Sequence, residues 1–205
     1  ALSLDDAAKV SGIRSKLLLQ VRGRGGLAMV ELSLADARAA LASYPTLSVA
    51  ANNGPSSTVV SGDTASLEKL LAELTAREVF AKLVRVDFAS HSSQVDPIEE
   101  ELRAALSDLR PQKPEHRFAS TVSLEREPSF DAEYWWRNLR DPVRLDERIR
   151  SLLDEGCDLV LEVSPHPVLT VAMAETAAGR APVLGVLRRN EPDREGALEA
   201  LAALH

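Results

Sequence analysis

The chain has 205 residues, 45% of them hydrophobic and 27% charged, and a net charge of −7 at neutral pH. This length is enough to bury a substantial core without disulfides or a metal. The acidic balance runs along the whole chain and argues against nucleic acid as the main partner. Cys157 is the only cysteine, the four histidines are scattered, and no apolar run approaches the roughly 20 residues needed to span a bilayer. These features favour a cytoplasmic protein with no disulfide, no metal and no membrane partner.

The first 25 residues begin with a helix signal. Ser3 is a candidate N-cap with Asp6 three residues later, so a helix is predicted from there to about Gln20. A helix in an α/β fold normally follows a strand, and this start therefore suggests a cut through a larger domain. The Gly-rich VRGRGG that follows is typical of a loop leading into a new unit.

Residues 26–90 change to short alternating segments. Ser33 and Asp36 mark the start of one predicted helix, and a second carries leucines at helical spacing (Leu67, Leu70, Leu71, Leu74). Strands are predicted at LAMVEL, LSVAANN, STVVSG and AKLVRVDFAS, with an Asn-Gly-Pro turn between the second and third. The resulting order is βαββαβ, which predicts a ferredoxin-like subdomain.

From residue 91 the chain returns to longer alternating segments. A helix is predicted with Asp96 as N-cap and Pro97 in its first turn, and its apolar face repeats every three or four residues (Ile98, Leu102, Leu106, Leu109). The further predicted elements are a strand RFASTVS, a helix DAEYWWRNLR, a helix from Pro142 to near Gly156, a strand DLVLEVSP, a helix from Pro167, a strand APVLGVL and a helix from Asp193. The whole pattern predicts an α/β fold.

His91 follows directly on a predicted strand and precedes a helix. That edge of an α/β sheet is where ligands usually bind, and a pKa near neutrality suits a general base. The alternative is a loop histidine that caps a neighbouring piece of chain.

Arg14 lies on the same helical face as Val10 and Leu17, a face that should be buried. A buried guanidinium needs an anionic partner. Two partners fit: a carboxylate of the protein, or the carboxylate of a substrate held by the planar fork.

Asn138 lies one turn from Tyr134 and Trp135 on a predicted helix, a polar residue on an aromatic face. It is either a core amide with its hydrogen bonds made or a group that orients a catalytic base. No serine of the chain lies in a Gly-x-Ser-x-Gly elbow, so no nucleophile is evident.

Five segments together resemble a known family: DFASHSSQVDPI, EYWWRNLRDPVR, LVLEVSPHPVLT, AANNGPSSTVVSGD and LGVLRRNE. In order and spacing they are similar to the motifs of the acyltransferase domains of type I polyketide synthases, relatives of the bacterial malonyl-CoA:acyl carrier protein transacylases. The resemblance implies a partial α/β-hydrolase-like core from residues 1–25 and 91–190, with the ferredoxin-like subdomain at 26–90. Residues 191–205 resemble the linker helix that follows such domains.

The resemblance also assigns roles by position. His91 in FASH matches the catalytic histidine, Arg14 in SGIRSK matches the arginine that pairs with the free carboxylate of a malonyl-type acyl group, and the carbonyl at Asn138 matches the group that orients the histidine. Phe88, Ala89 and Ser90 match the substrate-selecting loop. FASH is close to the Tyr-Ala-Ser-His form associated with methylmalonyl selection, with Phe88 in place of the tyrosine, and weakly favours a branched extender unit.

The implied activity is a two-step transfer of a malonyl-type extender unit from a coenzyme A thioester, through a serine, to the phosphopantetheine thiol of an acyl carrier protein. No bound cofactor is expected, and the implied partners are the carrier protein and neighbouring ketosynthase and linker domains. Because the family's Gly-His-Ser-x-Gly segment is absent from the sequence, we expect no turnover from this chain alone. The alternatives are a non-catalytic docking module for a carrier protein, favoured by Arg188 and Arg189, and an independent ferredoxin-like binding domain at 26–90.

Overall fold

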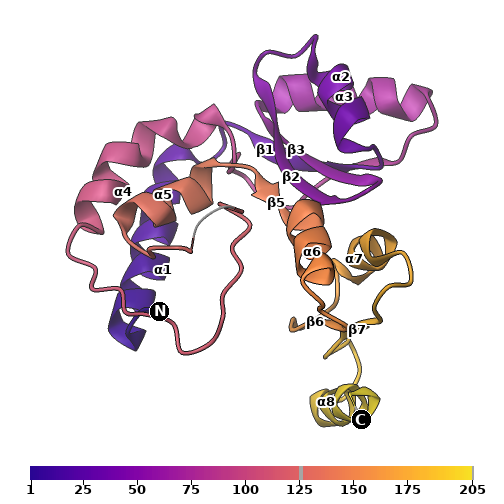
Figure 1. The fold of residues 1–205 in the computed structure, drawn as a ribbon. Coiled ribbons are helices and arrows are strands. Elements are labelled where there is room, and N and C mark those ends of the chain that lie inside the picture. The colour runs from indigo at the N-terminus through magenta and orange to yellow at the C-terminus, as the bar shows by residue number, and fades with distance from the viewer. Residues whose placement is uncertain (125–126, 205) are drawn as a thin grey trace. The chain divides into compact units, whose positions relative to one another are not determined.

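The computed structural model describes residues 1–124 and 127–204 (Figure 1). Contacts within the chain divide it into two compact units. The first holds residues 1–52 and 56–144, and the second holds residues 53–55 with the chain from residue 145 onward. The span 26–90 thus belongs to the first unit and does not separate as a unit of its own. The subdomain boundaries inferred from the family resemblance stay a prediction.

One half of the first unit is a group of helices. It comprises α1 (Leu4–Leu18), the short 3-10 helix η1 (Leu19–Val21), the 3-10 helix η2 (Ser93–Ile98), α4 (Glu99–Ala105) and α5 (Ala132–Arg140). Ser3 caps α1 as predicted, because its hydroxyl accepts a hydrogen bond from the Asp6 N–H at 3.1 Å. The start of α1 is thus set by the local sequence.

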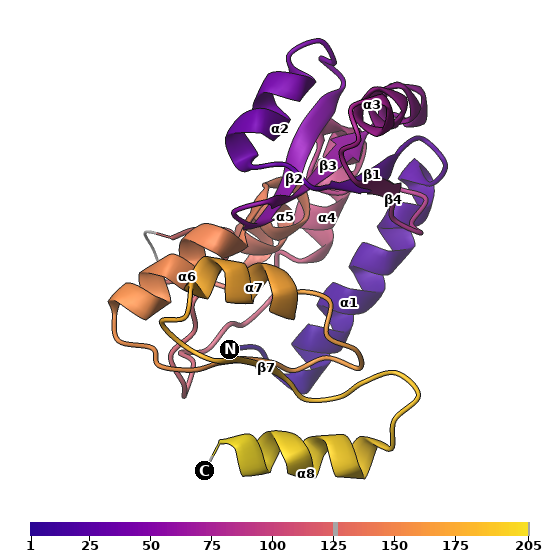
Figure 2. The ribbon, with the colours of Figure 1, turned by 90° about the vertical axis from the view of Figure 1, so that its right-hand side faces the viewer.

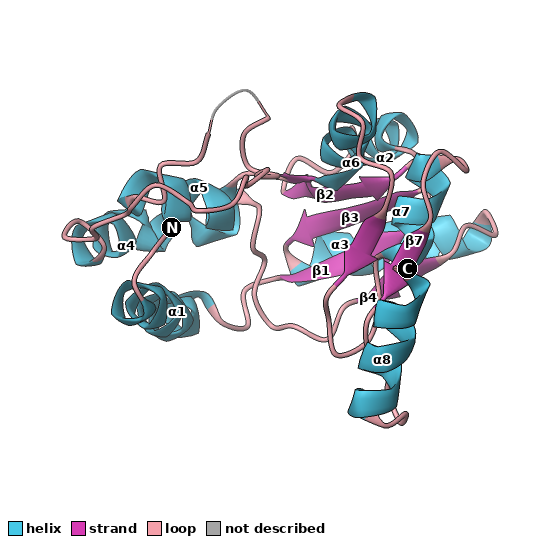
Figure 3. Cartoon of the chain, turned by 60° about the horizontal axis from the view of Figure 1, so that its bottom comes forward, coloured by secondary structure: helices cyan, strands magenta, loops and turns pink. Residues whose placement is uncertain are grey.

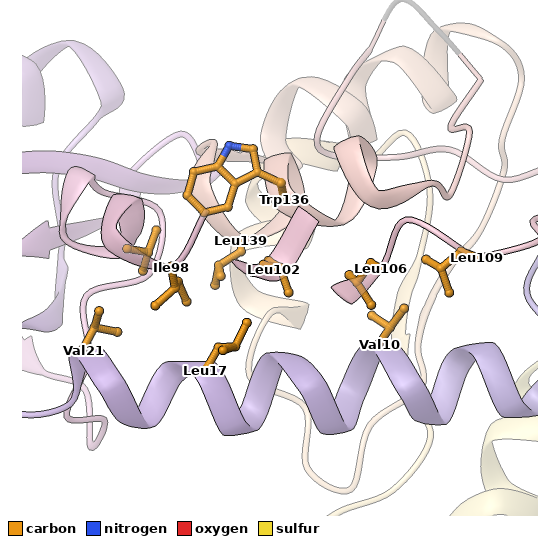
Figure 4. Close-up of a cluster of buried hydrophobic side chains, with 10 residues drawn as sticks. Val10, Leu17, Val21, Ile98, Leu102, Leu106, Leu109, Trp136 and Leu139 are labelled. Carbon is orange, nitrogen blue, oxygen red and sulfur yellow. The ribbon is translucent and has the colours of Figure 1, made fainter. Parts of the chain in front are cut away.

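A single apolar cluster holds these helices together (Figure 4). In that view Leu17 of α1 faces Leu102 of α4 and Leu139 of α5, and each of the three is at most 3% exposed. Full burial of a leucine contributes about 1.5–3 kcal/mol relative to an exposed one. The predicted apolar stripe of Ile98, Leu102, Leu106 and Leu109 is confirmed as buried in this cluster, but only Leu102 of the four lies within α4, which is shorter than the predicted helix.

The other half of the first unit is a small sheet covered by two helices. The strands are β1 (Gly26–Val30), β2 (Leu47–Gly54), β3 (Ser57–Gly62), β4 (Ala81–Leu83) and the two-residue β5 (Val143–Arg144). Their order is β4-β1-β3-β2-β5; β1 is antiparallel to β3 and β4, and β5 is parallel to β2. Helices α2 (Leu34–Leu41) and α3 (Thr64–Ala76) lie on one face (Figure 2). The β4-β1-β3-β2 order with two helices is the ferredoxin-like arrangement expected from the sequence.

The second unit contains α6 (Leu145–Asp154), β6 (Val160–Glu162), α7 (Thr170–Ala177), β7 (Val183–Gly185) and α8 (Asp193–Ala203) (Figure 3). Strands β6 and β7 are parallel, and α6 packs on α7 through Ile149, Leu153 and Met173. The Glu162 carboxylate accepts hydrogen bonds from the N–H groups of Val168 and Leu169, both at 2.9 Å, and so fixes the turn before α7.

Several details of the predicted elements are wrong. RFASTVS forms no strand in the described residues, while AKLVRVDFAS, DLVLEVSP and APVLGVL pair over only three residues each. Asp96 is not an N-cap: Ser92 caps η2 by accepting from the Gln94 N–H, and the Asp96 carboxylate instead pairs with Arg140. An apolar run alone does not make a strand, because a strand also needs a neighbour with which to pair its backbone.

Gly25 links the ferredoxin-like sheet to the loop that carries His91. A Cβ added there would lie 2.3 Å from the Gly62 carbonyl oxygen and 3.0 Å from the Ala89 Cβ. We expect Gly25→Ala to lower the free energy of unfolding by about 1–3 kcal/mol, because backbone must shift to admit it. Gly12→Ala, at a helical position where an added Cβ meets nothing within 4 Å, should instead raise stability by about 1 kcal/mol. Urea unfolding of both variants measures this difference. A Gly25→Ala variant with the native free energy of unfolding would contradict the close contact of Gly25 with Gly62 and Ala89.

Candidate functional site

The site begins at the end of α5. Asp131 caps the start of this helix by accepting from the Tyr134 N–H at 2.8 Å, and the helix ends at Arg140. Pro142 has no N–H to continue the helix and disfavours helical geometry in the residue before it. Asp141 is accordingly extended, with φ −79° and ψ 154°. The last carbonyls of the helix are left to find partners outside it.

His91 contacts one carbonyl of the last helical turn and one just beyond the helix. Its backbone N–H donates to the Leu139 oxygen at 2.9 Å, and its ring Nδ1 lies 2.7 Å from the Asp141 oxygen. A carbonyl oxygen only accepts, so Nδ1 carries the proton and, in the neutral ring, Nε2 is left as the acceptor. The Arg137 Nε donates to the Asp141 carboxylate at 2.8 Å and helps to hold that residue in place. His91 is thus presented as a base through Nε2.

The loop around His91 is built for a fixed geometry. His91 has a φ of 59°, the left-handed region that few residues other than glycine adopt, although histidine, asparagine and aspartate do so more often than most. Ala89 and Ser90 are buried, and the Ser92 hydroxyl donates to the Ala89 carbonyl at 2.8 Å. Unusual backbone conformations that the surroundings hold in place tend to cluster at functional sites.

Arg14 lies in the same site, on α1. Its Nη1 donates to the Asn138 side-chain oxygen of α5 at 2.8 Å, and burial lowers the pKa of its guanidinium. Within residues 1–124 and 127–204 the structure records no carboxylate that pairs with Arg14. Of the two partners left open by the sequence, a protein carboxylate is therefore not found among the described residues.

The pKa of His91 lies below its ordinary value. Burial is the main cause; the nearby positive charge of Arg14 also lowers it, while the hydrogen bond to the Asp141 carbonyl and the Asp141 charge raise it. The depressed pKa keeps the ring neutral at pH 7, and the neutral ring is the form that can accept a proton.

This lowered pKa predicts the pH dependence of any reaction that uses His91 as a base. The rate should stay on its plateau as the pH falls through about 6.5, the ordinary histidine value, and drop only at lower pH. The acidic limb of kcat/KM for such a reaction checks this. A limb above the ordinary value would show that the hydrogen bond to Asp141 and its charge, and not burial, dominate the pKa of His91.

A pocket of about 400 Å³ lies along α1 beside Arg14. Its lining includes Val10 and Leu18 of α1 and Trp135 of α5. Arg14 is its one charged lining residue among the described residues. A pocket with apolar walls, the hydroxyls of Ser11 and Ser15 and a single cationic group is suited to a short carbon chain that ends in a carboxylate.

The structure brings His91, Arg14 and Asn138 together but corrects one role. The carbonyl that holds the His91 ring belongs to Asp141, not to Asn138. Asn138 lies inside α5 and turns its side chain to Arg14, whereas Asp141 lies beyond the last helical residue. The Asp-Pro pair after a helix was the signal in the sequence. Phe88 is half-buried against the helical cluster, and the roles of Phe88, Ala89 and Ser90 toward a substrate stay predictions.

The described residues contain neither a candidate membrane span nor a candidate metal cluster. In the described part of the chain, no helix is long and apolar enough to cross a membrane. Across the same residues, no three histidine, cysteine, aspartate or glutamate side chains converge in a way that could hold a metal ion.

Comparison with known proteins places this geometry in a family. The family model described as the acyl transferase domain matches residues 1–205. Polyketide synthase GfsB of Streptomyces halstedii is 47% identical over 203 residues, which are 95% of this chain and 4% of that protein. The pikromycin polyketide synthase component PikAIII of Streptomyces venezuelae is 42% identical over 205 residues, 98% of this chain and 13% of that protein. The chain thus spans a small part of the curated relatives it matches.

Solved structures agree with the sequence relatives. The acyltransferase domain from module 8 of the salinomycin polyketide synthase superimposes with a TM-score of 0.94 at 43% identity, over 98% of this chain and 49% of that one. A loading acyltransferase from the avermectin modular polyketide synthase gives a TM-score of 0.93 at 36% identity, over 99% of this chain and 66% of that one. The predicted fold class, an α/β-hydrolase-like core with a ferredoxin-like subdomain, is confirmed by this likeness. The chain belongs to the acyl transferase domain family, among the acyltransferases of modular polyketide synthases.

Proposed function

We propose that the chain is the histidine-bearing part of an acyltransferase that loads a malonyl-type extender unit from coenzyme A onto the phosphopantetheine thiol of an acyl carrier protein. One observation carries the proposal. His91 is fixed by the Asp141 carbonyl with Nε2 left as a base, and it lies within electrostatic reach of a half-buried Arg14, for which the described residues provide no recorded carboxylate partner. Family membership supports the same reading.

The first half of the reaction uses His91 as base and then as acid. Nε2 takes the proton of a serine hydroxyl as the serine oxygen attacks the thioester carbonyl. The carbon–sulfur bond then breaks, and the departing coenzyme A thiolate receives that proton from the imidazolium. The result is an acyl-serine and a neutral His91.

The second half repeats these steps with a different nucleophile. Nε2 takes the proton of the phosphopantetheine thiol, the sulfur attacks the acyl-serine, and the serine oxygen leaves with the proton from His91. The carrier protein departs with the acyl group as a thioester. Both halves need the serine of the family's Gly-His-Ser-x-Gly elbow, which is not within these 205 residues, so we expect these residues alone not to turn over.

Arg14 selects the acyl group by its charge. A guanidinium presents a planar fork of donors that matches a carboxylate, and the pair is strong when water is excluded. The adjoining pocket of Val10, Leu18 and Trp135 offers an apolar wall for the carbon chain. This arrangement favours acyl groups with a free carboxylate over those without one.

Phe88 bears on the size of the extender unit that the site accepts. Phe88 keeps an aromatic ring at the position associated with methylmalonyl selection and packs against the helical cluster. We propose methylmalonyl as the favoured unit on this ground. A methyl group distinguishes two substrates by only about 1–3 kcal/mol, so the preference should be modest.

Radiolabelled methylmalonyl-CoA tests the proposal. The acyltransferase that includes the serine-bearing segment should take up about one acyl group per chain and pass it to a holo carrier protein. A docking module, the reading favoured by the exposed Arg188 and Arg189, would bind the carrier protein without taking up label. Carrier binding with no acyl uptake would therefore establish the docking role and overturn the enzymatic one.

A further inference from the structure

We infer that Asn138 is a positioning residue, which aims the Arg14 guanidinium through a neutral hydrogen bond and leaves its full charge for the carboxylate of the acyl group. The inference rests on the proposed function and adds a determinant of charge selectivity to it. Its basis is the 2.8 Å contact from the Arg14 Nη1 to the Asn138 side-chain oxygen.

The contact is directional. A guanidinium has only donors, so the atom of Asn138 that faces it must be the carbonyl oxygen Oδ1. Arg14 comes from α1 and Asn138 from α5, 124 residues later, and the two helices are fixed to each other by the cluster around Leu17 and Leu139. One Nη group is thereby held from a rigid helix, and the remaining N–H groups of the fork keep a set orientation.

The choice of an amide matters because it carries no charge. Aspartate has nearly the same shape as asparagine, and at this position its carboxylate would form an ion pair with Arg14. That ion pair would compete with the carboxylate of a substrate. An amide offers one hydrogen bond and leaves the cation uncompensated in a half-buried site, where an unpaired charge is costly. Burial lowers the pKa of Arg14, as expected for a cation that is partly removed from water.

The positive charge of Arg14 also affects the protonation of His91. Arg14 lowers the pKa of His91, acting against the Asp141 charge that raises it. A negative charge at position 138 would offset Arg14 and stabilise the imidazolium. The pH profile therefore reports on the charge at position 138. The ratio of activities toward acyl groups with and without a free carboxylate reports on how Arg14 is aimed, and a purely structural role for Asn138 would not move that ratio.

The test uses the acyltransferase that includes the serine-bearing segment, with methylmalonyl-CoA and propionyl-CoA as substrates that differ only in the free carboxylate. For Asn138→Asp we expect the ratio of the two kcat/KM values to fall at least tenfold and the acidic limb of the pH profile to move upward. Asn138→Ala removes the acceptor without adding charge. It should reduce the ratio less and leave the limb in place. Asn190→Asp, at an exposed position, is the matched control and should change neither.

A double variant separates the possible outcomes. If Asn138 acts through Arg14, Asn138→Asp should not change the ratio further in an Arg14→Ala background. An unchanged ratio in Arg14→Ala alone would overturn the role that the proposed function gives to Arg14. A reduced ratio in Arg14→Ala, with no change on adding either substitution at Asn138 to the native protein, would overturn this inference only. Thermal unfolding identifies a variant that has lost its fold. If Asn138→Asp is such a variant, the ratio of the two kcat/KM values in Asn138→Ala tests the inference.

Discussion

Replacing His91 with asparagine should remove acyl transfer while leaving the fold intact. General acid–base catalysis by one side chain contributes about 10²–10⁴ in rate, and a loss of that size in kcat/KM is expected. Asparagine is the better substitute because it tolerates the φ of 59° and its amide N–H can still donate to the Asp141 carbonyl. Alanine would add backbone strain to the chemical loss.

The rate of acyl uptake from methylmalonyl-CoA measures this effect. His166→Asn is the matched control, because the His166 Nδ1 only accepts from the Arg189 N–H at 3.3 Å in an exposed turn. That control should keep native activity. A His91→Asn variant that acylates at the native rate and unfolds at the native temperature would remove His91 from the mechanism.

Replacing Arg14 with alanine should change which acyl groups the site accepts. Losing one partner of a buried charge pair costs about 2–5 kcal/mol, so the preference for methylmalonyl-CoA over propionyl-CoA should fall by on the order of 100-fold. Much of the fall should come from a higher KM for the carboxylated substrate, because the carboxylate contact is made before and during the reaction.

Two further variants show whether the fork or only the charge is needed. Arg14→Lys keeps a cation but loses the planar pair of donors, and we expect it to recover part of the selectivity. Arg180→Ala removes an exposed arginine that pairs with Asp154 in the second unit and should change nothing. Full selectivity in Arg14→Ala would mean that another group binds the carboxylate.

The helices were predictable because their signals are local. Ser3 and Ser33 cap their helices as expected, and the leucines of α3 and α4 face the cores that their spacing predicts. The predicted strands were too long because an apolar run such as DLVLEVSP fixes neither burial nor a neighbouring strand: Val163 in this run is 79% exposed and only Val160–Glu162 pair. The predicted ferredoxin-like arrangement was nevertheless correct, because it depends on the order of the strands and helices along the chain and not on their lengths.

The side chains of the site were predictable where they break a local pattern. Arg14 interrupts an apolar face, and Asn138 interrupts an aromatic one. Asp141 was missed because it acts through its backbone carbonyl, a group that every residue has. Only Pro142, which ends the helix and turns that carbonyl outward, distinguishes the position in the sequence.

The proposed chemistry requires His91 to be a neutral imidazole at neutral pH, with its proton on Nδ1 and with Nε2 free as the base. Nitrogen-15 NMR of the histidine ring, assigned with the His91→Asn variant, measures the protonation of each ring nitrogen directly. We predict a protonated Nδ1 and an unprotonated Nε2 at pH 7, and an imidazolium only below the ordinary histidine pKa. A proton on Nε2 at pH 7, in either the other tautomer or the imidazolium, would contradict the account.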